Sequence, residues 1–343
     1  MSRVAQFRQP QPNLRANLRL RSYPAIGNCH LAAAMTWGTE YGALFTPARC
    51  HFVAERTVHG VGLGLVPVTS RSILITGCSS GIGYVCAHAL KKRGWRVFAA
   101  CRRQQDADRL AAEGLETLQL DYADPESIAA GAKFVLDATG GQLDALFNNG
   151  AYAHPGAVED LSTEHLRKVM ETNFIGWYDL TRLILPAMRR QKSGRIVNCS
   201  SVLGFLAVRF TSAYSASKFA VEGWSDALRL ELRDTGIHVS LLQPGPIRSR
   251  MLENSRARFM ETIDVRNSHF RKEYGRELSR LSGSSKRSAF KLGPEAMIAP
   301  LIHALESPSP RARYRVTVPT QVGAWLKRLL PTRMMDNVLL RQR

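Results

Sequence analysis

From Arg71 onward, short apolar runs alternate with longer amphipathic stretches, and this alternation restricts the chain to few folds. The runs have the length and β-branched content of strands, and the stretches have the apolar spacing of helices that bury one face. Such alternation implies right-handed β–α–β crossovers, which build a parallel sheet covered by helices on both faces. We expect strands at Ser72–Thr76, Arg96–Cys101, Thr117–Leu120, Leu143–Phe147, Arg195–Cys199, Ile237–Leu242 and Tyr314–Val318. The helices expected between them include Tyr84–Arg93, Pro125–Ala138, Thr163–Arg190 and Tyr214–Asp234.

Two regions interrupt this pattern. Residues 1–70 carry arginine but no lysine, few acids and several prolines, and they sustain no amphipathic helix. They predict a disordered extension or a start site assigned too far upstream, rather than a targeting peptide. Residues 248–292 are polar, basic and rich in serine. An insertion at this point of an α/β domain often covers the ligand, so we expect a lid within a catalytic domain that spans residues 71–343.

The composition of the whole chain narrows its partners. Lysine and arginine number 47 against 28 acids, a net charge of +19, which favours anionic partners. The basic residues are spread along the chain without interleaved aromatics, which argues against nucleic acid. The segment Val322–Pro331 is basic and amphipathic, so it fits either a membrane surface or, as we favour, a last helix docked on the core.

The cysteines and the hydropathy pattern bear on location. The six cysteines form no CxxC pair and no pattern with histidine, so neither a disulfide scaffold nor a structural metal site is expected. No stretch reaches the roughly 18 uncharged apolar residues that a membrane-spanning helix needs. We therefore expect a cytoplasmic protein, with membrane association at the surface as the alternative.

A glycine-rich turn joins the first expected strand to the first expected helix. Gly77 permits a tight turn, Gly81 lets the backbone approach a pyrophosphate, and Gly83 allows close packing of helix on strand. The N-terminus of the helix then offers free N–H groups and the positive end of its dipole to phosphates. We interpret the turn as a dinucleotide-binding site, with a turn needed only for packing as the alternative. Its residues are Gly77, Ser79, Ser80, Gly81, Ile82 and Gly83.

The residues after the second strand indicate which dinucleotide binds. In proteins that bind NAD an acid stands there and accepts a hydrogen bond from the ribose 2′-hydroxyl. This chain has Arg102 and Arg103 instead, and no acid before Asp106. Two guanidinium groups suit a 2′-phosphate, so NADP(H) is preferred and NAD(H) stays an alternative. Asp121, after the third strand, either accepts a hydrogen bond from the adenine amine or caps the helix that begins at Pro125.

Four polar residues form the candidate catalytic group. Tyr214 and Lys218 lie one helical turn apart, so an ammonium group stands near a phenol whose ordinary pKa, about 10, is too high for acid–base work. Ser201 follows a buried strand, at the edge of the sheet where ligands bind, and can hydrogen-bond a carbonyl as negative charge develops. Asn173 stands inside an expected helix. Because asparagine is a mediocre helix former, we expect its side chain either to be exposed to solvent or to have a function there.

Taken together, these motifs resemble the short-chain dehydrogenase/reductase family, in its TGxxxGxG/YxxxK subfamily. The resemblance is close over residues 71–250, and the tail from Leu292 is similar to bacterial NADP-dependent aldehyde reductases of this family. One departure is Asn148-Asn149-Gly150-Ala151, where the family usually has Asn-Asn-Ala-Gly. The matching residues are, in order, Thr76-Gly77, Gly81-Ile82-Gly83, Asn148-Asn149-Gly150, Asn173, Ser201, Tyr214, Lys218 and Pro244-Gly245.

The resemblance implies a single Rossmann-type, doubly wound sheet of about seven strands and a role for each polar residue. Tyr214 would be the general acid in reduction and the base in oxidation. Lys218 would hold the nicotinamide ribose and lower the pKa of the tyrosine. Ser201 would orient the carbonyl, and Asn173 would anchor a water that links Lys218 to solvent.

The same resemblance adds cofactor residues and partners. The further residues expected at the cofactor are Asn148, Pro244, Gly245, Ile247 and Ser249. We expect an NADP(H)-dependent oxidoreductase that interconverts a small lipophilic aldehyde or ketone and its alcohol, as a homodimer or homotetramer. The apolar stretch Leu203–Leu206 favours an apolar pocket. The alternatives are a nucleotide-sensing protein without catalysis and a peripheral membrane adaptor that binds through basic termini.

Overall fold

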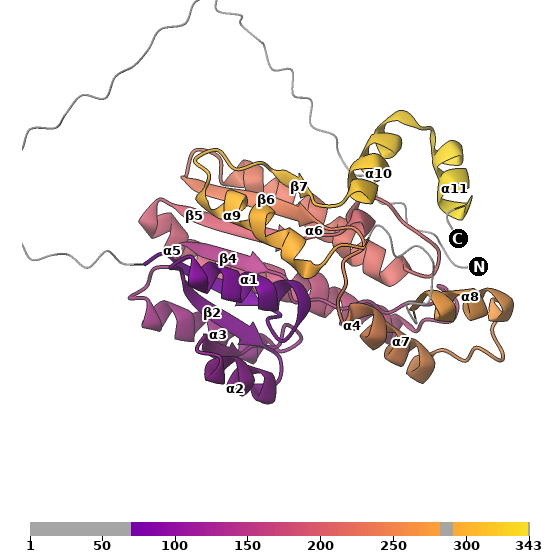
Figure 1. Ribbon diagram of the computed structural model, residues 1–343, viewed down its shortest axis with the longest axis horizontal. Coiled ribbons are helices and arrows are strands. Elements are labelled where there is room, and N and C mark those ends of the chain that lie inside the picture. The colour runs from indigo at the N-terminus through magenta and orange to yellow at the C-terminus, as the bar shows by residue number, and fades with distance from the viewer. Residues whose placement is uncertain (1–69, 282–290, 342–343) are drawn as a thin grey trace, which may run out of the picture. The chain divides into compact units, whose positions relative to one another are not determined.

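The computed structural model describes residues 70–281 and 291–341 and contains one parallel sheet of seven strands. The strand order is β3-β2-β1-β4-β5-β6-β7, and every neighbouring pair is parallel (Figure 1). This confirms the doubly wound α/β fold. The strands are β1 Ser72–Thr76, β2 Arg96–Cys101, β3 Glu116–Gln119, β4 Ala145–Asn148, β5 Gly194–Cys199, β6 Ile237–Gln243 and β7 Arg313–Arg315. The extension expected over residues 1–70 lies outside the described residues, apart from Ser70.

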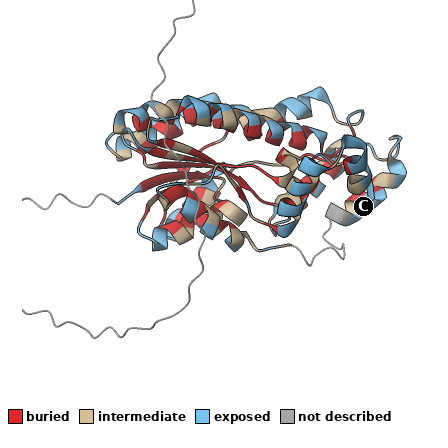
Figure 2. Ribbon diagram, turned by 90° about the horizontal axis from the view of Figure 1, so that it is seen from above, coloured by how far each residue is buried: buried red, intermediate tan, exposed pale blue. Residues whose placement is uncertain are grey.

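Helices cover both faces of the sheet, and their inner sides are buried (Figure 2). Helices α1 and α9 pack together over one face, and α3, α5 and α6 lie over the other. The central strands β1 and β4 have no exposed residue, as expected for parallel strands covered on both sides. The helices are α1 Gly81–Lys92, α2 Gln104–Ala112, α3 Pro125–Ala138, α4 Thr163–Met170, α5 Gly176–Gln191, α6 Ser212–Glu231, α7 Met251–Thr262, α8 Arg271–Leu281, α9 Ile298–Glu306, α10 Val318–Leu329 and α11 Thr332–Arg341.

The last expected strand, Tyr314–Val318, is wrong at its C-terminal end. Strand β7 stops at Arg315, and α10 begins at Val318. The side chain of Thr317 accepts a hydrogen bond from the amide of Thr320, which is an N-cap, and Pro319 occupies the first turn of the helix. The β-branched residues here thus start a helix, because cap and proline outweigh strand propensity.

The helix expected over Thr163–Arg190 is interrupted. Helices α4 and α5 are separated by a wider π-helical turn, Glu171–Ile175, which contains Asn173. Asn173 is fully buried, its Oδ1 accepts a bond of 3.0 Å from the amide of Tyr152, and its Nδ2 donates one of 2.8 Å to the carbonyl of Tyr152. Such turns concentrate at functional sites, and this one fastens the loop after β4 to the helix.

The region expected as a lid, residues 248–292, contains two helices with a small core of their own. Helices α7 and α8 pack with the loop after β4 around the buried rings of Phe210, Phe259 and Tyr274. The Tyr274 hydroxyl accepts a bond of 2.9 Å from the amide of Ala157 and donates one to Asp160. This part of the chain is therefore held to the loop after β4, although residues 282–290 lie outside the described part.

Candidate active site

The carboxyl ends of the central strands bring the predicted site residues to one edge of the sheet. The glycine turn follows β1, Ser201 follows β5, and the segment that begins at Pro244 follows β6. Ser249 of this segment lies beside the glycine turn, since a Cβ placed on Gly81 would be 3.4 Å from the Cβ of Ser249. This edge is where open parallel sheets bind ligands.

The glycine turn requires glycine for two different reasons. Gly77 and Gly81 have φ of +67° and +61°, in the left-handed region. A Cβ on Gly77 would lie 2.6 Å from Cα of Gly150, and one on Gly83 would lie 2.4 Å from the carbonyl oxygen of Gly77. Gly150 stands where the family usually has alanine, and here it lets β4 and the turn approach closely.

The start of α1 fits the phosphates of a dinucleotide. Its N-cap residue, Ser80, makes no hydrogen bond with its side chain to the helix, and the first turn contains no acid. The N–H groups at this end thus have no side-chain acceptor at the cap and no repelling carboxylate in the first turn. This donor set is the one that a pyrophosphate needs.

Thr76 and Asn149 hold the glycine turn in place. Neither residue was assigned a role from the sequence. The Thr76 hydroxyl accepts bonds from the amides of Asn149, at 2.9 Å, and Gly150, at 3.1 Å. The side chain of Asn149 donates to the carbonyl of Thr76 at 3.0 Å. Both residues stand within the matched motifs, and that is the only signal that could have singled them out.

Asn148 does not reach the site with its side chain. The residue has no exposed surface, and its amide group is bonded to Tyr122, Thr181 and Asn198 at 2.7, 3.1 and 2.9 Å. Its side chain points into the interior, because successive residues of a strand point to opposite faces, and its predicted contact with the cofactor stays a prediction. Its role here is to link β4 with β5 and α5.

The adenosine side of the predicted site is open. Arg102 and Arg103 are exposed at the end of β2, and Arg103 is the N-cap residue of α2. Asp121 does not cap α3: Asp124 does, while Asp121 accepts a bond from the amide of Ala123 at 3.0 Å. Arg109 was not predicted as a site residue from the sequence. Its guanidinium donates a hydrogen bond of 2.8 Å to the carbonyl of Ser79 in the glycine turn.

Tyr214, Lys218 and Ser201 come together as expected. The ammonium group of Lys218 is buried, donates to the carbonyl oxygen of Cys199 at 2.9 Å and lies 5.8 Å from the centre of the Tyr214 ring. It also lies 4.3 Å from the ring of Trp177, a cation–π contact that partly replaces lost hydration. The Ser201 hydroxyl accepts a bond of 3.1 Å from the amide of Leu203 and lies close enough to the Tyr214 phenol to lower its pKa.

Burial moves both pKa values, and for the tyrosine the direction opposes the prediction. Burial raises the pKa of Tyr214 well above its ordinary value, the nearby Cys199 raises it further, and the Ser201 hydroxyl close by lowers it. Burial lowers the pKa of Lys218 to about 8, while Cys199 and Glu222 act in the opposite direction. The phenol is therefore neutral at pH 7, because the loss of hydration on burial disfavours its charged form.

Asn173 is connected to the catalytic helix through Ser217. Its Nδ2 donates to the Ser217 hydroxyl at 3.1 Å, and that hydroxyl donates to the carbonyl of Tyr214 at 2.7 Å. The first turns of α6 are thereby fixed to the π-helical turn. The predicted water between Asn173 and Lys218 stays a prediction.

The segment after β6 is fixed against the start of α10. The amide of Val202 donates to the carbonyl of Pro244 at 2.8 Å, and a Cβ on Gly245 would lie 2.2 Å from the hydroxyl of Thr317. Ile247 pairs with Leu292 in an isolated bridge. The predicted residues Pro244, Gly245, Ile247 and Ser249 thus lie on one strap beside the glycine turn.

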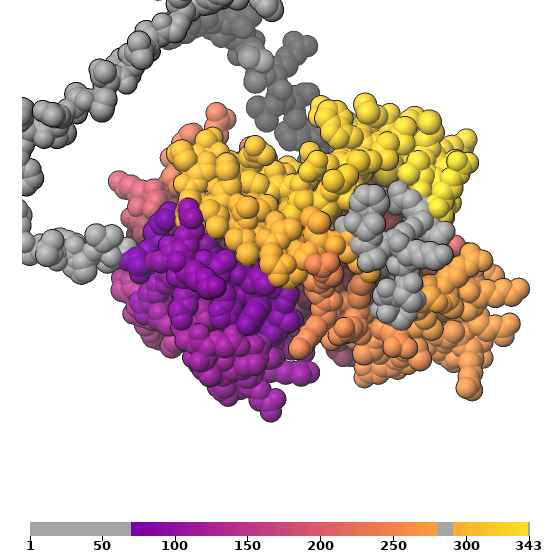
Figure 3. All heavy atoms as spheres, in the orientation of Figure 1, coloured from indigo at the N-terminus to yellow at the C-terminus, as the bar shows by residue number. Residues whose placement is uncertain are grey.

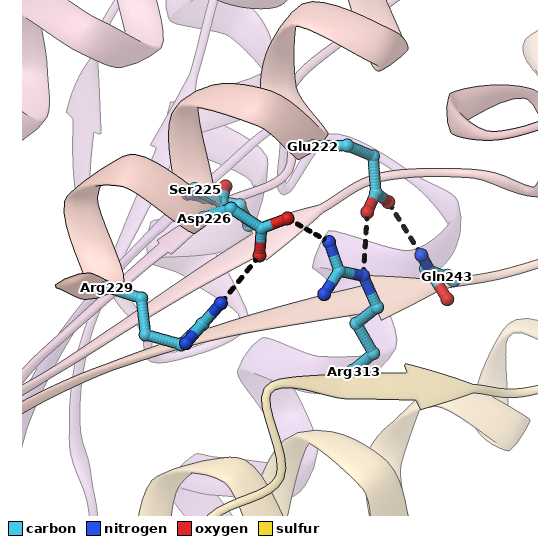
Figure 4. A network of polar contacts seen from close by, with 7 residues as sticks. Glu222, Ser225, Asp226, Arg229, Gln243 and Arg313 are labelled. Carbon is cyan, nitrogen blue, oxygen red and sulfur yellow. Dashed lines mark hydrogen bonds and ion pairs between the residues drawn. The ribbon is translucent and has the colours of Figure 1, made fainter.

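A second polar network connects helix α6 to strands β6 and β7 at the edge of the sheet (Figure 4). Glu222, one turn beyond Lys218, accepts a bond from Gln243 of β6 at 2.8 Å and one from Arg313 of β7 at 3.1 Å. Arg313 also pairs with Asp226 at 2.6 Å. Nothing in the sequence pattern links these distant residues, and only the fold brings them together.

Residues 71–259, more than half of the chain, match the family described as short chain dehydrogenase. The chain belongs to the short-chain dehydrogenase/reductase family. It is therefore an oxidoreductase of the type that acts on CH–OH groups with a nicotinamide acceptor.

Two curated relatives are similar along most of their length. The uncharacterized oxidoreductase YbbO of Escherichia coli K12 is 40% identical over 272 residues, which cover 79% of this chain and 95% of that protein. Human 17-beta-hydroxysteroid dehydrogenase type 6 is 34% identical over 301 residues, which cover 85% of this chain and 92% of that protein.

Two solved structures of dehydrogenases and reductases agree with the fold and contain nicotinamide cofactors. A short-chain dehydrogenase/reductase from Burkholderia phymatum in complex with NAD has a TM-score of 0.64 and 25% identity, and the match covers 76% of this chain and 92% of that one. A variant of actinorhodin polyketide ketoreductase with NADPH has a TM-score of 0.61 and 28% identity, with coverage of 73% and 97%.

Replacing Lys218 should reveal the cost of burying its charge. The pKa of Lys218, about 8 in the folded protein, lies below the 10.5 of an ordinary lysine. The burial of its charge therefore lowers the free energy of unfolding by its full amount below pH 8, where the group is charged in both states, and by nothing above pH 10.5, where it is neutral in both. We expect Lys218→Met to increase the free energy of unfolding by about 3 kcal/mol at neutral pH, and this difference to shrink as the pH rises. Chemical denaturation of both proteins across this range measures it, and a gain independent of pH would contradict the assignment.

Arg313→Met should destabilise the protein because Glu222 keeps its charge in a nearly buried position without its cationic partner. We expect a loss of about 2 kcal/mol, since the pair is only partly exposed. Arg229→Met is the matched control: Arg229 contacts Asp226 alone, at 3.0 Å, near the surface, and should cost less than about 1 kcal/mol. Equal losses in urea denaturation would show that the network of Figure 4 has no special weight.

Proposed function

We propose that the protein is an NADP(H)-dependent reductase that interconverts a lipophilic aldehyde or ketone and its alcohol. The observation that carries the proposal is the buried phenol of Tyr214, which lies close to the Ser201 hydroxyl and beside the ammonium group of Lys218. A proton donor and a second hydroxyl at the ligand-binding edge of the sheet suit a carbonyl oxygen that becomes an alcohol.

The proposed mechanism assigns each side chain a task. The nicotinamide ring, when bound, supplies the hydride in reduction and accepts it in oxidation. Ser201 donates a hydrogen bond to the carbonyl oxygen and orients it, and Tyr214 gives its proton to that oxygen as negative charge develops. The ammonium group of Lys218 stabilises the phenolate that remains and holds the nicotinamide ribose.

The preference for NADP(H) rests on Arg102 and Arg103. Both are exposed where the adenosine ribose of a bound dinucleotide would lie, and no acid stands there to select the 2′-hydroxyl of NAD. The guanidinium of Arg109 is bonded to Ser79 on the same side, but it is also paired with Glu113 at 2.7 Å, so the unpaired charge comes from Arg102 and Arg103. A 2′-phosphate would be attracted by the guanidinium groups of Arg102 and Arg103.

The preference for a lipophilic carbonyl rests on the apolar residues near Ser201 and in helices α7 and α8. Leu203 and the buried Leu206 follow Ser201 directly, and the core of α7 and α8 is aromatic. The relatives described above include one named for a hydroxysteroid, which is a lipophilic alcohol. A non-catalytic nucleotide sensor is the alternative, and the presence of both Tyr214 and Lys218 disfavours it.

The assembly and location belong to the same proposal. We expect a homodimer or homotetramer, because Leu166, Ile175, Tyr178 and Phe219 are exposed apolar residues on neighbouring helices of one face. The cysteines in the described part of the chain are free, which fits a reducing compartment such as the cytoplasm.

Tyr214→Phe should abolish turnover and leave NADPH binding nearly intact, since the phenol serves the reaction and not the pyrophosphate. A screen of aldehydes and ketones, followed by NADPH absorbance, finds a substrate for the parent protein. We expect the variant to lose at least about a hundredfold in kcat, the usual value of a positioned acid. Turnover near that of the parent would refute the assigned acid.

The double variant Arg102→Ala with Arg103→Ala should raise KM for NADPH far more than KM for NADH. A charge-assisted contact to the 2′-phosphate is lost in one case, and NADH has no such group. Arg93→Ala serves as the control, because its guanidinium pairs with Glu306, away from the turn. Equal changes in both constants would show that the arginines do not select the cofactor.

A further inference from the structure

Helix α10 carries its large apolar side chains on the outside. Val318, Val322, Trp325 and Leu329 are 60, 49, 64 and 69% exposed. Their spacing of four, three and four residues places them along one stripe of the helix. Four large side chains in one exposed stripe exceed the scattered apolar residues that are normal on a surface.

The inner side of α10 is made of small residues. Thr320 and Gly323 are buried, and a Cβ on Gly323 would lie 2.8 Å from Cδ1 of Leu206. The Thr320 hydroxyl is bonded to that of Thr317 at 2.9 Å. The helix therefore docks on the core as favoured from the sequence, but through its small face, with its amphipathic pattern reversed relative to an ordinary surface helix.

The surroundings of the stripe are positively charged. Residues 311–343 contain eight arginines or lysines and a single acid, Asp336. Lys327, Arg328 and Arg333 are exposed at and just beyond the end of the stripe. Helix α11 adds the exposed Met334, and both helices lie on the surface in Figure 3, coloured yellow.

We propose that this face, formed by the apolar stripe of α10 with Lys327, Arg328 and Arg333, binds the surface of a membrane that contains anionic lipids. An exposed apolar stripe with a tryptophan and flanking cations is the composition of a helix that lies in the lipid interface. A second copy of the chain fits less well, because it would bring another basic segment against this one. No described helix is long and apolar enough to cross the bilayer, so the contact is peripheral.

The position of α10 connects this surface to the site. Gly323 contacts Leu206, and Thr317 contacts Gly245, so the inner side of the helix borders the residues that follow β5 and β6. Substrate dissolved in the lipid would then reach the pocket without crossing water. This last step rests on the proposed function, whereas membrane binding itself does not.

Flotation of the full chain with lipid vesicles tests the proposal. We expect binding to vesicles of phosphatidylcholine and phosphatidylglycerol, weaker binding to phosphatidylcholine alone, and a decrease with salt. The double variant Trp325→Glu with Leu329→Glu should lose at least about tenfold in affinity, because two large apolar contacts become charged. Leu230→Glu, at a site on α6 that is 64% exposed, is the matched control and should bind like the parent.

Two further measurements separate the outcomes. Activity on a water-soluble carbonyl should be unchanged in the double variant, which shows that it is folded, and vesicle binding should persist in Tyr214→Phe whether or not the proposed reaction is correct. Vesicle binding that survives the double substitution would overturn the proposal. So would a parent protein that does not bind the vesicles; if light scattering then shows that the double variant forms smaller species than the parent, the face is an interface between copies of the chain instead.

Discussion

The site depends on the interactions that hold the buried ammonium group of Lys218. A charge without exposed surface is costly, and the protein keeps it by hydrogen bonding it to the carbonyl of Cys199 at the end of β5 and by placing it over the ring of Trp177. Strand β5, helix α5 and helix α6 must therefore meet in one arrangement. The same arrangement leaves the Tyr214 phenol neutral and in contact with Ser201.

The elements that hold this group in place are polar connections between distant segments. The π-helical turn with Asn173 fixes the loop after β4 and the start of α6, and the Glu222–Arg313 network fixes α6 to β6 and β7. Among the described residues, three buried side-chain atoms have no hydrogen-bond partner, and one of them, Oε1 of Gln243, belongs to the second network. Buried polar networks of this kind are costly when incomplete, so they favour a single geometry.

Much of the fold and the glycine turn could be predicted because local pattern determines them. The strands β1 and β2 and the helix α3 agree with their predicted bounds, since each is bordered by turn residues, a cap or a proline. The order of Tyr214, Lys218 and Ser201 relative to the strands was enough to place them at one edge. By contrast, the inward direction of the Asn148 side chain could not be predicted, because sequence order does not say which face of a strand a side chain occupies within a motif.

Periodicity and the chemistry of side chains a few residues apart were enough to predict the alternating fold, the glycine turn after β1 and the spacing of Tyr214 and Lys218. Only the tertiary structure decided the direction of the Tyr214 pKa, the role of Arg109 and the side of α10 that faces outward. Burial, and contact between segments distant along the chain, set those properties. A linear pattern cannot state how deeply a group is covered or which of two helix faces finds a partner.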